Sequence, residues 1–338
     1  MPLLKRVIGG GIAGVVICAL VAVLHSQGAL FKPDTSRPVV ASAEYDRWRK
    51  EISNWGRWGK DDEMGALNLI TPAKRRAAAA LVKEGLAVSL ASNAATQKDV
   101  DVPCPAQWTM TAANQGAASD SIAYPCIHGA GATHLDSLAH IFFSGVAWNG
   151  YPVSDVVSKE KGAVRNSVMN MKHGIVTRAV LFDIPRLKGL PYLEPGTRIF
   201  PEDLEAWEQK AGVKIGAGDA LLLRWGRWAR RAKLGAWAID EGAAGLDNSV
   251  IPWLKQRDVA VIAWETPGYV PQPAGDLPRL ALHNFALTML GIMLIDRADL
   301  DALSEAAAAR NRWEFMLSVA PLPIPYGTGS PVNPLALF

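Results

Sequence analysis

The sequence predicts a single α/β domain that follows an apolar N-terminal segment. Two observations carry this prediction. Apolar runs of strand length recur along the chain, and segments with helix caps separate them. The composition is that of a folded protein, since 49% of the 338 residues are hydrophobic and 20% are charged. The formal net charge of +3 comes without a basic block, so no nucleic-acid partner is indicated.

The first 28 residues are predicted to be a signal peptide or a membrane anchor. Lys5 and Arg6 precede the run 7–24, which contains no charged residue. Its length lies between that of a long secretory core and that of a short membrane-spanning helix, so both interpretations stay open. Residues 29–42 hold prolines and little periodicity and are predicted to be a tether. The folded domain is then expected to cover residues 43–338.

Within the domain, strands and helices are predicted to alternate. Thr71 is a good N-cap for a helix that Pro72 opens and Gly85 follows. Uninterrupted apolar runs predict strands buried on both faces. In chain order the predicted elements are a helix at 73–84, a strand at 88–91, a strand at 177–184, a helix at 202–211, and strands at 219–225, 258–265 and 315–320.

Three of the six histidines fall within thirteen residues, at His128, His134 and His140. His134 and Asp136 are two residues apart, so on an extended segment their side chains leave from the same face. Imidazole nitrogen and carboxylate oxygen are a ligand set suited to Zn²⁺, Mn²⁺ or Fe²⁺. His140 returns to that side if the chain turns after Asp136. Spacing alone leaves a structural role for these histidines open.

The segment 133–140 resembles the H-x-G-T-H-x-D-x-P-x-H signature of the cyclase family of metal-dependent hydrolases, which includes bacterial kynurenine formamidase and isatin hydrolase. Two further segments, 57–72 and 320–334, resemble the N-terminal and C-terminal segments of the longer members. The resemblance implies a swivelling β/β/α cyclase-like domain that forms a homodimer. It also implies one or two bound Zn²⁺ or Mn²⁺ ions.

The resemblance assigns roles within the histidine cluster. His134 and Asp136 match metal ligands, and Asp136 would bridge two ions where two are bound. His140 matches the last histidine of the motif, which acts as general acid and base. The first motif histidine would fall on Ala130, so we expect His128 to take its place as a ligand.

Further residues are implied more weakly. His283 and Asp296 resemble the distal histidine and acidic ligand of the family, with Asp in place of the usual Glu. Glu265 follows a predicted strand and is expected to lie behind the metal or beside the substrate, unless it only forms a turn. Trp58 is expected to stack on an aromatic substrate, although most of the twelve tryptophans are expected to be packing residues.

Cys104 and Cys126 are expected to form a disulfide if the chain is exported. The alternative is that Cys126, close to His128 in sequence, is a soft metal ligand.

The resemblance implies a hydrolase of a small amide or cyclic amide. An arylformamidase-like reaction, from N-formylkynurenine to kynurenine and formate in tryptophan catabolism, is the leading hypothesis. Hydrolysis of an isatin-like lactam or a lactone is the alternative chemistry. An exported binding protein with the same fold and no turnover is the alternative class. We expect the protein in the periplasm, either free or anchored to the inner membrane by its N-terminal segment only.

Overall fold

The computed structural model describes residues 31, 34–266, 270 and 277–338. The predicted signal peptide or anchor lies outside these residues. Within the described part of the chain, no helix combines the length and the apolar character needed to cross a membrane.

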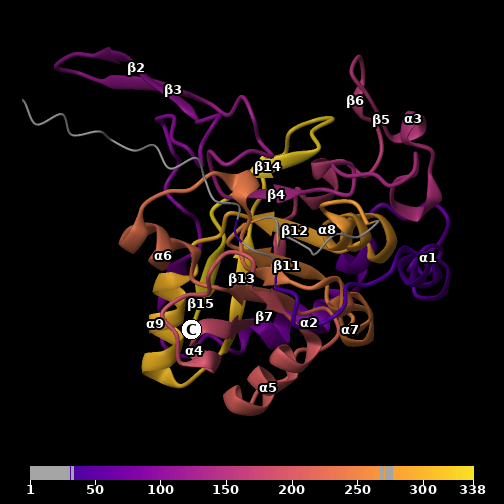
Figure 1. Cartoon of the computed structure of the whole chain (residues 1–338). Coiled ribbons are helices and arrows are strands. Elements are labelled where there is room, and N and C mark those ends of the chain that lie inside the picture. The colour runs from indigo at the N-terminus through magenta and orange to yellow at the C-terminus, as the bar shows by residue number, and fades with distance from the viewer. Residues whose placement is uncertain (1–30, 32–33, 267–269, 271–276) are drawn as a thin grey trace, which may run out of the picture.

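A nine-stranded mixed sheet forms the centre of the domain (Figure 1). Its four central strands are parallel, and antiparallel strands extend it on both sides. This arrangement confirms the predicted α/β class. Across the sheet the strands are β1 (Ala87–Ser89), β15 (Leu335–Leu337), β13 (Glu314–Val319), β7 (Ile175–Asp183), β9 (Ala220–Arg224), β11 (Val261–Trp264), β12 (Met293–Asp296), β4 (His134–Asp136) and β14 (Gly329–Pro331).

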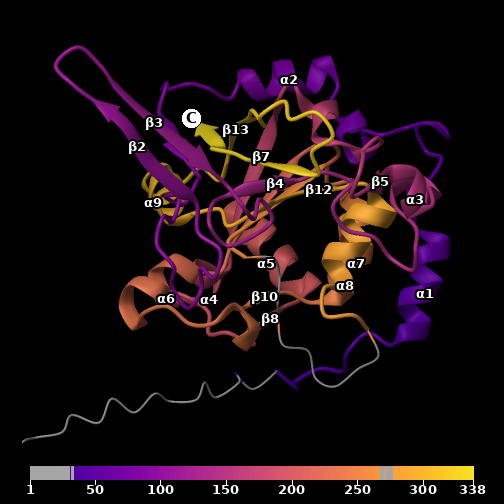
Figure 2. The ribbon, with the colours of Figure 1, turned by 90° about the horizontal axis from the view of Figure 1, so that it is seen from above.

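Helices cover both faces of this sheet. Figure 2 shows α2 on one side and α4 and α5 on the other. The helices are α1 (Ser42–Glu51), α2 (Pro72–Ala79), α3 (Val153–Val156), α4 (Ile184–Lys188), α5 (Pro201–Ala211), α6 (Arg227–Leu234), α7 (Ile251–Arg257), α8 (Ala281–Phe285) and α9 (Asp301–Arg310). Short helical turns are η1 (Gly65–Leu69), η2 (Trp148–Gly150), η3 (Val168–Met171), η4 (Ile239–Glu241), η5 (Asn248–Val250) and η6 (Ala286–Leu290).

Two predicted boundaries were wrong by three residues or more. Helix α2 is capped by Thr71 as expected, but it ends at Ala79, because the N–H groups of Glu84 and Gly85 bond the carbonyl of Phe338 instead of continuing a helix. Strand β11 begins three residues later than predicted, because Asp258 adopts a left-handed conformation that ends α7.

All residues of β9 and β11 are buried, as expected for parallel strands covered on both faces. In contrast, a hairpin of β2 (Gln107–Ala113) and β3 (Ala118–Ala123) projects from the body and is exposed along its whole length (Figures 1 and 2). The expected disulfide between Cys104 and Cys126 is confirmed and closes the base of this hairpin. Two small strand pairs, β5 (Val157–Ser158) with β6 (Gly162–Ala163) and β8 (Arg198–Ile199) with β10 (Gly245–Leu246), complete the fold.

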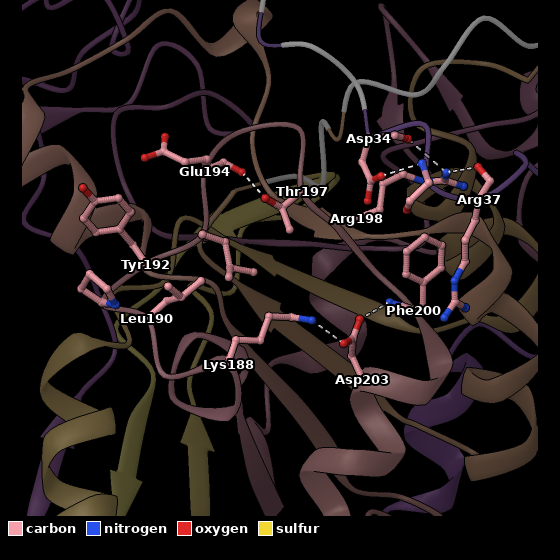
Figure 3. A pocket seen from close by; sticks show the side chains of 13 residues that line it. Asp34, Arg37, Lys188, Leu190, Tyr192, Glu194, Thr197, Arg198, Phe200 and Asp203 are labelled. Atoms are coloured by element: carbon pink, nitrogen blue, oxygen red, sulfur yellow. Dashed lines mark hydrogen bonds and ion pairs between the residues drawn. The ribbon is translucent and has the colours of Figure 1, made fainter.

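Part of the predicted tether is bound to the domain. The guanidinium of Arg198 is fully buried and forms an ion pair with Asp247 at 2.7 Å. It also donates hydrogen bonds to the carbonyls of Asp34, Arg37 and Pro38. Figure 3 shows Arg198 beside Asp34 and Arg37 at the edge of an open pocket of about 590 Å³. The described residues that line this pocket include none of the predicted site residues.

This docking leads to a prediction for truncation. A variant that begins at Ser42 should be less stable than one that begins at Asp34, because it lacks the three carbonyls that satisfy a buried cation. Charged hydrogen bonds contribute about 1.5–3 kcal/mol each, and water would compensate part of the loss, so we expect a difference of about 2–4 kcal/mol. Urea denaturation of the two variants measures it. Equal unfolding free energies would show that the segment is only a tether.

Candidate active site

The candidate site forms at the edge of the sheet where β4 lies between β12 and β14. β4 is antiparallel to β12 and places His134 opposite Asp296. His134 and Asp136 leave the strand on one face, while Leu135 between them is fully buried in the core. The extended conformation expected for this segment is therefore confirmed, and all three strand residues are buried.

His128 and His140 approach Asp136 from outside the strand. The Nδ1 atom of His128 lies 2.6 Å from Oδ1 of Asp136, and its Nε2 lies 2.8 Å from the hydroxyl of Thr328. The His140 ring stacks on His128 in parallel, with centroids 3.4 Å apart. A turn in which the His140 N–H bonds the Ser137 carbonyl brings Nε2 of His140 to 3.9 Å from Asp136 Oδ2.

His283 reaches the same carboxylates from helix α8. Its Nε2 lies 3.3 Å from Oδ2 of Asp136 and 3.7 Å from Oδ2 of Asp296. The indole N–H of Trp264 donates a hydrogen bond to the other oxygen of Asp296. The structure thus brings together all six residues assigned to the metal and to proton transfer, whereas Ala130 is buried and offers no ligand atom. The individual roles stay predictions.

The donor atoms fit a divalent cation. The Nδ1–H of His134 donates to the carbonyl of Ala132, which leaves a lone pair on Nε2. That Nε2 and Oδ2 of Asp136 are both buried and have no hydrogen-bond partner among the described residues. Nε2 of His134 lies 3.6 Å from Asp136 Oδ1 and 3.9 Å from Asp296 Oδ2. Two ligand atoms that each lie about 2.0–2.2 Å from the same ion are separated from each other by nearly the distances measured here.

Charge is unevenly distributed over the cluster. Burial alone would raise the pKa of Asp136, but its hydrogen bond with His128 and the charges of the other imidazoles hold this pKa well below its usual range. Burial lowers the pKa of His140 to about 4, so this ring is neutral at pH 7. Burial would also lower the pKa of His283, but its contacts with Asp136 and Asp296 raise it to about 9. A cation that binds His283 must therefore displace a proton.

Glu265 directly follows β11, and its side chain contacts the N-terminal end of α6. Its Oε2 accepts hydrogen bonds from the backbone N–H groups of Trp225, Gly226 and Arg227, at 2.7–3.0 Å. These contacts hold the helix start against the end of β11, and no contact with the histidine cluster is seen among the described residues. Trp58 is half-buried and packs against Trp148 with centroids 6.2 Å apart. Substrate contact by either residue stays a prediction.

The environment of Glu265 predicts a pH dependence of stability. Burial raises its pKa from 4.5 to about 8. A carboxyl with a raised pKa in the folded state stabilises the protein fully below pH 4.5, and this contribution is lost as the pH rises through about 8. The wild type should therefore lose about 3 kcal/mol more than Glu265→Gln between pH 5 and pH 8. Urea denaturation at several pH values tests this, with the exposed Glu305→Gln as control; parallel profiles for all three proteins would contradict it.

Sequence reasoning missed three residues of the site. Thr328 and Gly329 lie in the C-terminal segment whose resemblance was noted, but nothing in that segment indicated a contact with His128. A Cβ atom at position 329 would lie 2.5 Å from Cε1 of His128, so only glycine leaves room for the ring. Trp264 ends an apolar run that predicts burial and gives no sign that its N–H holds Asp296.

The chain resembles known proteins in both sequence and fold. The model of the cyclase family matches residues 99–269. A solved structure described as a novel cyclase is 30% identical, covers 86% of this chain and 99% of its own, and superposes with a TM-score of 0.73. The chain belongs to the cyclase family. This confirms the resemblance on which the site assignments depend.

Other solved structures share the fold at lower identity. Isatin hydrolase A from Labrenzia aggregata, bound to benzyl benzoate, is 22% identical, with 77% of this chain and 94% of that chain covered and a TM-score of 0.53. An isatin hydrolase bound to the product analogue thioisatinate is 16% identical, with 81% and 99% covered and a TM-score of 0.50. No curated protein matches the chain significantly.

Proposed function

We propose that this cyclase-family protein is a metal-dependent hydrolase of a small amide or cyclic amide. The observation that carries the proposal is that Nε2 of His134 and Oδ2 of Asp136, which form no hydrogen bond among the described residues, converge with His283 and Asp296. This nitrogen and oxygen set suits Zn²⁺ or Mn²⁺. A divalent cation held there would polarise a carbonyl group and lower the pKa of a water molecule.

We assign the proton transfer to His140. Amide hydrolysis forms a C–O bond, breaks the C–N bond and transfers one proton from water to the departing nitrogen. A neutral imidazole can accept that proton and then release it, and burial keeps His140 neutral at pH 7. Its side chain is 22% exposed, so a substrate can reach it. Stacking on His128 fixes the plane of the ring.

For the substrate, we propose an arylformamidase-like reaction, with N-formylkynurenine as the leading candidate. The fold is shared with isatin hydrolases, one of which was solved with a product analogue. An aryl formamide and isatin both carry an acyl group on an arylamine nitrogen, so the same bond breaks in either substrate. An isatin-like lactam is therefore the alternative substrate for the same site. A lactone is a further alternative, in which the acyl C–O bond breaks and the proton goes to the departing oxygen.

Hydrolysis assays with metal-replete protein test this proposal. The panel is N-formylkynurenine, formanilide, isatin and an aryl lactone, each with Zn²⁺ or Mn²⁺. We expect turnover of the aryl formamides that disappears on chelation and returns when the metal is added back. If isatin alone is turned over, the protein is an isatin-type lactam hydrolase and not a formamidase. If the panel compounds bind but none is hydrolysed, the result favours an exported binding protein.

We also propose that the protein is exported and forms a homodimer. The disulfide between Cys104 and Cys126 supports an oxidising compartment, because cytosolic thiols are kept reduced. Fractionation of cells locates the protein, and light scattering of the purified protein gives its mass. Recovery in the cytosol, or a monomeric mass, would contradict the respective part of this proposal.

A further inference from the structure

Arg297 is a buried cation that has no carboxylate partner among the described residues. It directly follows β12 and is 4% exposed. Its one hydrogen bond within this part of the chain runs from Nη1 to the backbone carbonyl of Asp101, at 3.4 Å. A guanidinium that is removed from water without a counter-charge is costly, because nothing compensates for its lost hydration. The surroundings of Arg297 therefore decide whether its charge is balanced.

The neighbours of Arg297 do not balance its charge. The carboxylate of Asp101 is fully buried and already accepts hydrogen bonds from Arg227 at 2.8 Å and from Arg231 at 2.9 Å. Arg231 also pairs with the exposed Asp99. In this group, which we call the arginine cluster, three guanidiniums face two carboxylates. One positive charge is left over, so the cluster matches a monoanion.

Two further groups beside the cluster add no negative charge to it. The ring centroid of Trp228 lies 5.1 Å from Cζ of Arg297 and 5.9 Å from Cζ of Arg227, where it provides cation–π contacts only. Glu265 is buried, but its Oε2 bonds the backbone at the start of α6, and burial raises its pKa to about 8. Glu265 is therefore largely neutral at pH 7, and neither group replaces a carboxylate at Arg297.

The free atoms of Arg297 form one edge of its guanidinium. Because Nη1 bonds Asp101, the remaining donors are Nε and Nη2, and neither has a hydrogen-bond partner among the described residues. These two nitrogens form a rigid fork whose geometry matches the two oxygens of a carboxylate. Nε of Arg227 is likewise buried without a partner in the described part of the chain. The chemistry of this edge and the single excess charge both favour a carboxylate over a dianionic phosphate.

Arg297 lies at the end of the sheet where ligands bind in folds of this kind. β9, β11 and β12 are parallel, and Arg297 follows the last residue of β12. Open α/β sheets bind ligands outside the carboxyl ends of their parallel strands. The carbonyl of Arg297 also accepts a hydrogen bond from the hydroxyl of Thr133, the residue before His134, at 2.6 Å. The arginine cluster and the candidate metal site therefore share this end of the sheet.

We propose that Arg297 binds a carboxylate group, which accepts hydrogen bonds from Nε and Nη2 and is further attracted by Arg227. The carboxylate belongs either to a small free acid or to the substrate. The second source rests on the proposed function, because N-formylkynurenine carries an amino-acid carboxylate, whereas formanilide carries none.

Acetate titration of the full chain tests the site without turnover. A ligand of the folded state raises the unfolding temperature, which is measured against acetate with chloride at the same ionic strength as reference. We expect Arg297→Gln to bind acetate about 10- to 100-fold more weakly than the wild type, the range typical of charged hydrogen bonds. All proteins are loaded with the same metal, so acetate bound to the ion contributes equally.

Two further variants make this titration specific. Arg297→Lys keeps the charge but lacks the fork, so we expect its acetate affinity to lie between those of the wild type and Arg297→Gln. If Arg297→Gln does not fold, the lysine variant decides, and an affinity equal to that of the wild type counts against the site. Arg76→Gln, which removes an exposed arginine of α2, is the control and should bind acetate like the wild type.

A kinetic comparison identifies a carboxylate that belongs to the substrate. The ratio of kcat/KM for N-formylkynurenine to kcat/KM for formanilide should be at least 10-fold lower in Arg297→Gln than in the wild type. A fall in acetate affinity alone indicates a free acid, and a fall in this ratio alone indicates the substrate. If both quantities stay unchanged, the proposed site is wrong. If the wild type hydrolyses neither formamide, the proposed function fails, and the acetate titration alone decides on Arg297.

Discussion

Asp136→Asn should abolish metal binding and turnover together. Among the described residues, Asp136 is the one carboxylate that approaches all four histidines, His128, His134, His140 and His283, at 2.6 to 3.9 Å. An amide has the same shape but no charge, and it turns an N–H₂ group toward imidazoles or a cation. We expect metal affinity to fall by more than the roughly 100-fold of a lost supporting hydrogen bond. Elemental analysis and Zn²⁺ titration measure the loss.

The exposed Asp155→Asn serves as control for this change. It should keep wild-type metal content and activity. A folded Asp136→Asn protein that retains a full equivalent of metal would show that the ion is held elsewhere, and the proposed ligand set would then be wrong.

His140→Ala should instead keep the metal and lose turnover. His140 is assigned to proton transfer, and removal of a general acid and base typically costs about 10²- to 10⁴-fold in kcat. The metal content of the variant should stay at the wild-type level, because His134, His283 and the two carboxylates remain. Steady-state kinetics and elemental analysis on the same preparation separate the two effects.

The control for His140 is His173→Ala, which removes an exposed histidine and should change neither quantity. If His140→Ala loses metal as well, His140 is a ligand. The group formed by His128, Asp136 and His140 would then hold a cation itself, and the proton carrier would have to be sought elsewhere.

The strands that the sequence predicts most clearly are those buried on both faces. β9, β11 and the second half of β7 are largely apolar runs because helices cover the sheet on each side. Strand β14 could not be predicted, since Gly329–Pro331 carries no pattern and is extended only because it pairs with β4. The exposed hairpin has no buried face and gave no signal either.

The site residues also fall into those that the sequence predicts and those that it does not. The spacing of His134 and Asp136 predicts their shared face from strand geometry alone, and the structure confirms that face. His283 and Asp296 could be joined to them only through the family resemblance, because more than a hundred residues separate them in the chain. Thr328 and the docking of residues 34–38 on Arg198 depend on tertiary contacts that no local pattern encodes.

The disulfide between Cys104 and Cys126 affects how the protein can be prepared. The Gly129 N–H bonds the carbonyl of Cys126, so the covalent link and the ring of His128 belong to one turn of the chain. Recombinant material made in a reducing bacterial cytoplasm would carry free thiols at the base of that turn, and free thiols bind Zn²⁺ themselves. Reliable metal stoichiometry therefore calls for an oxidising expression host and for purification buffers without dithiothreitol.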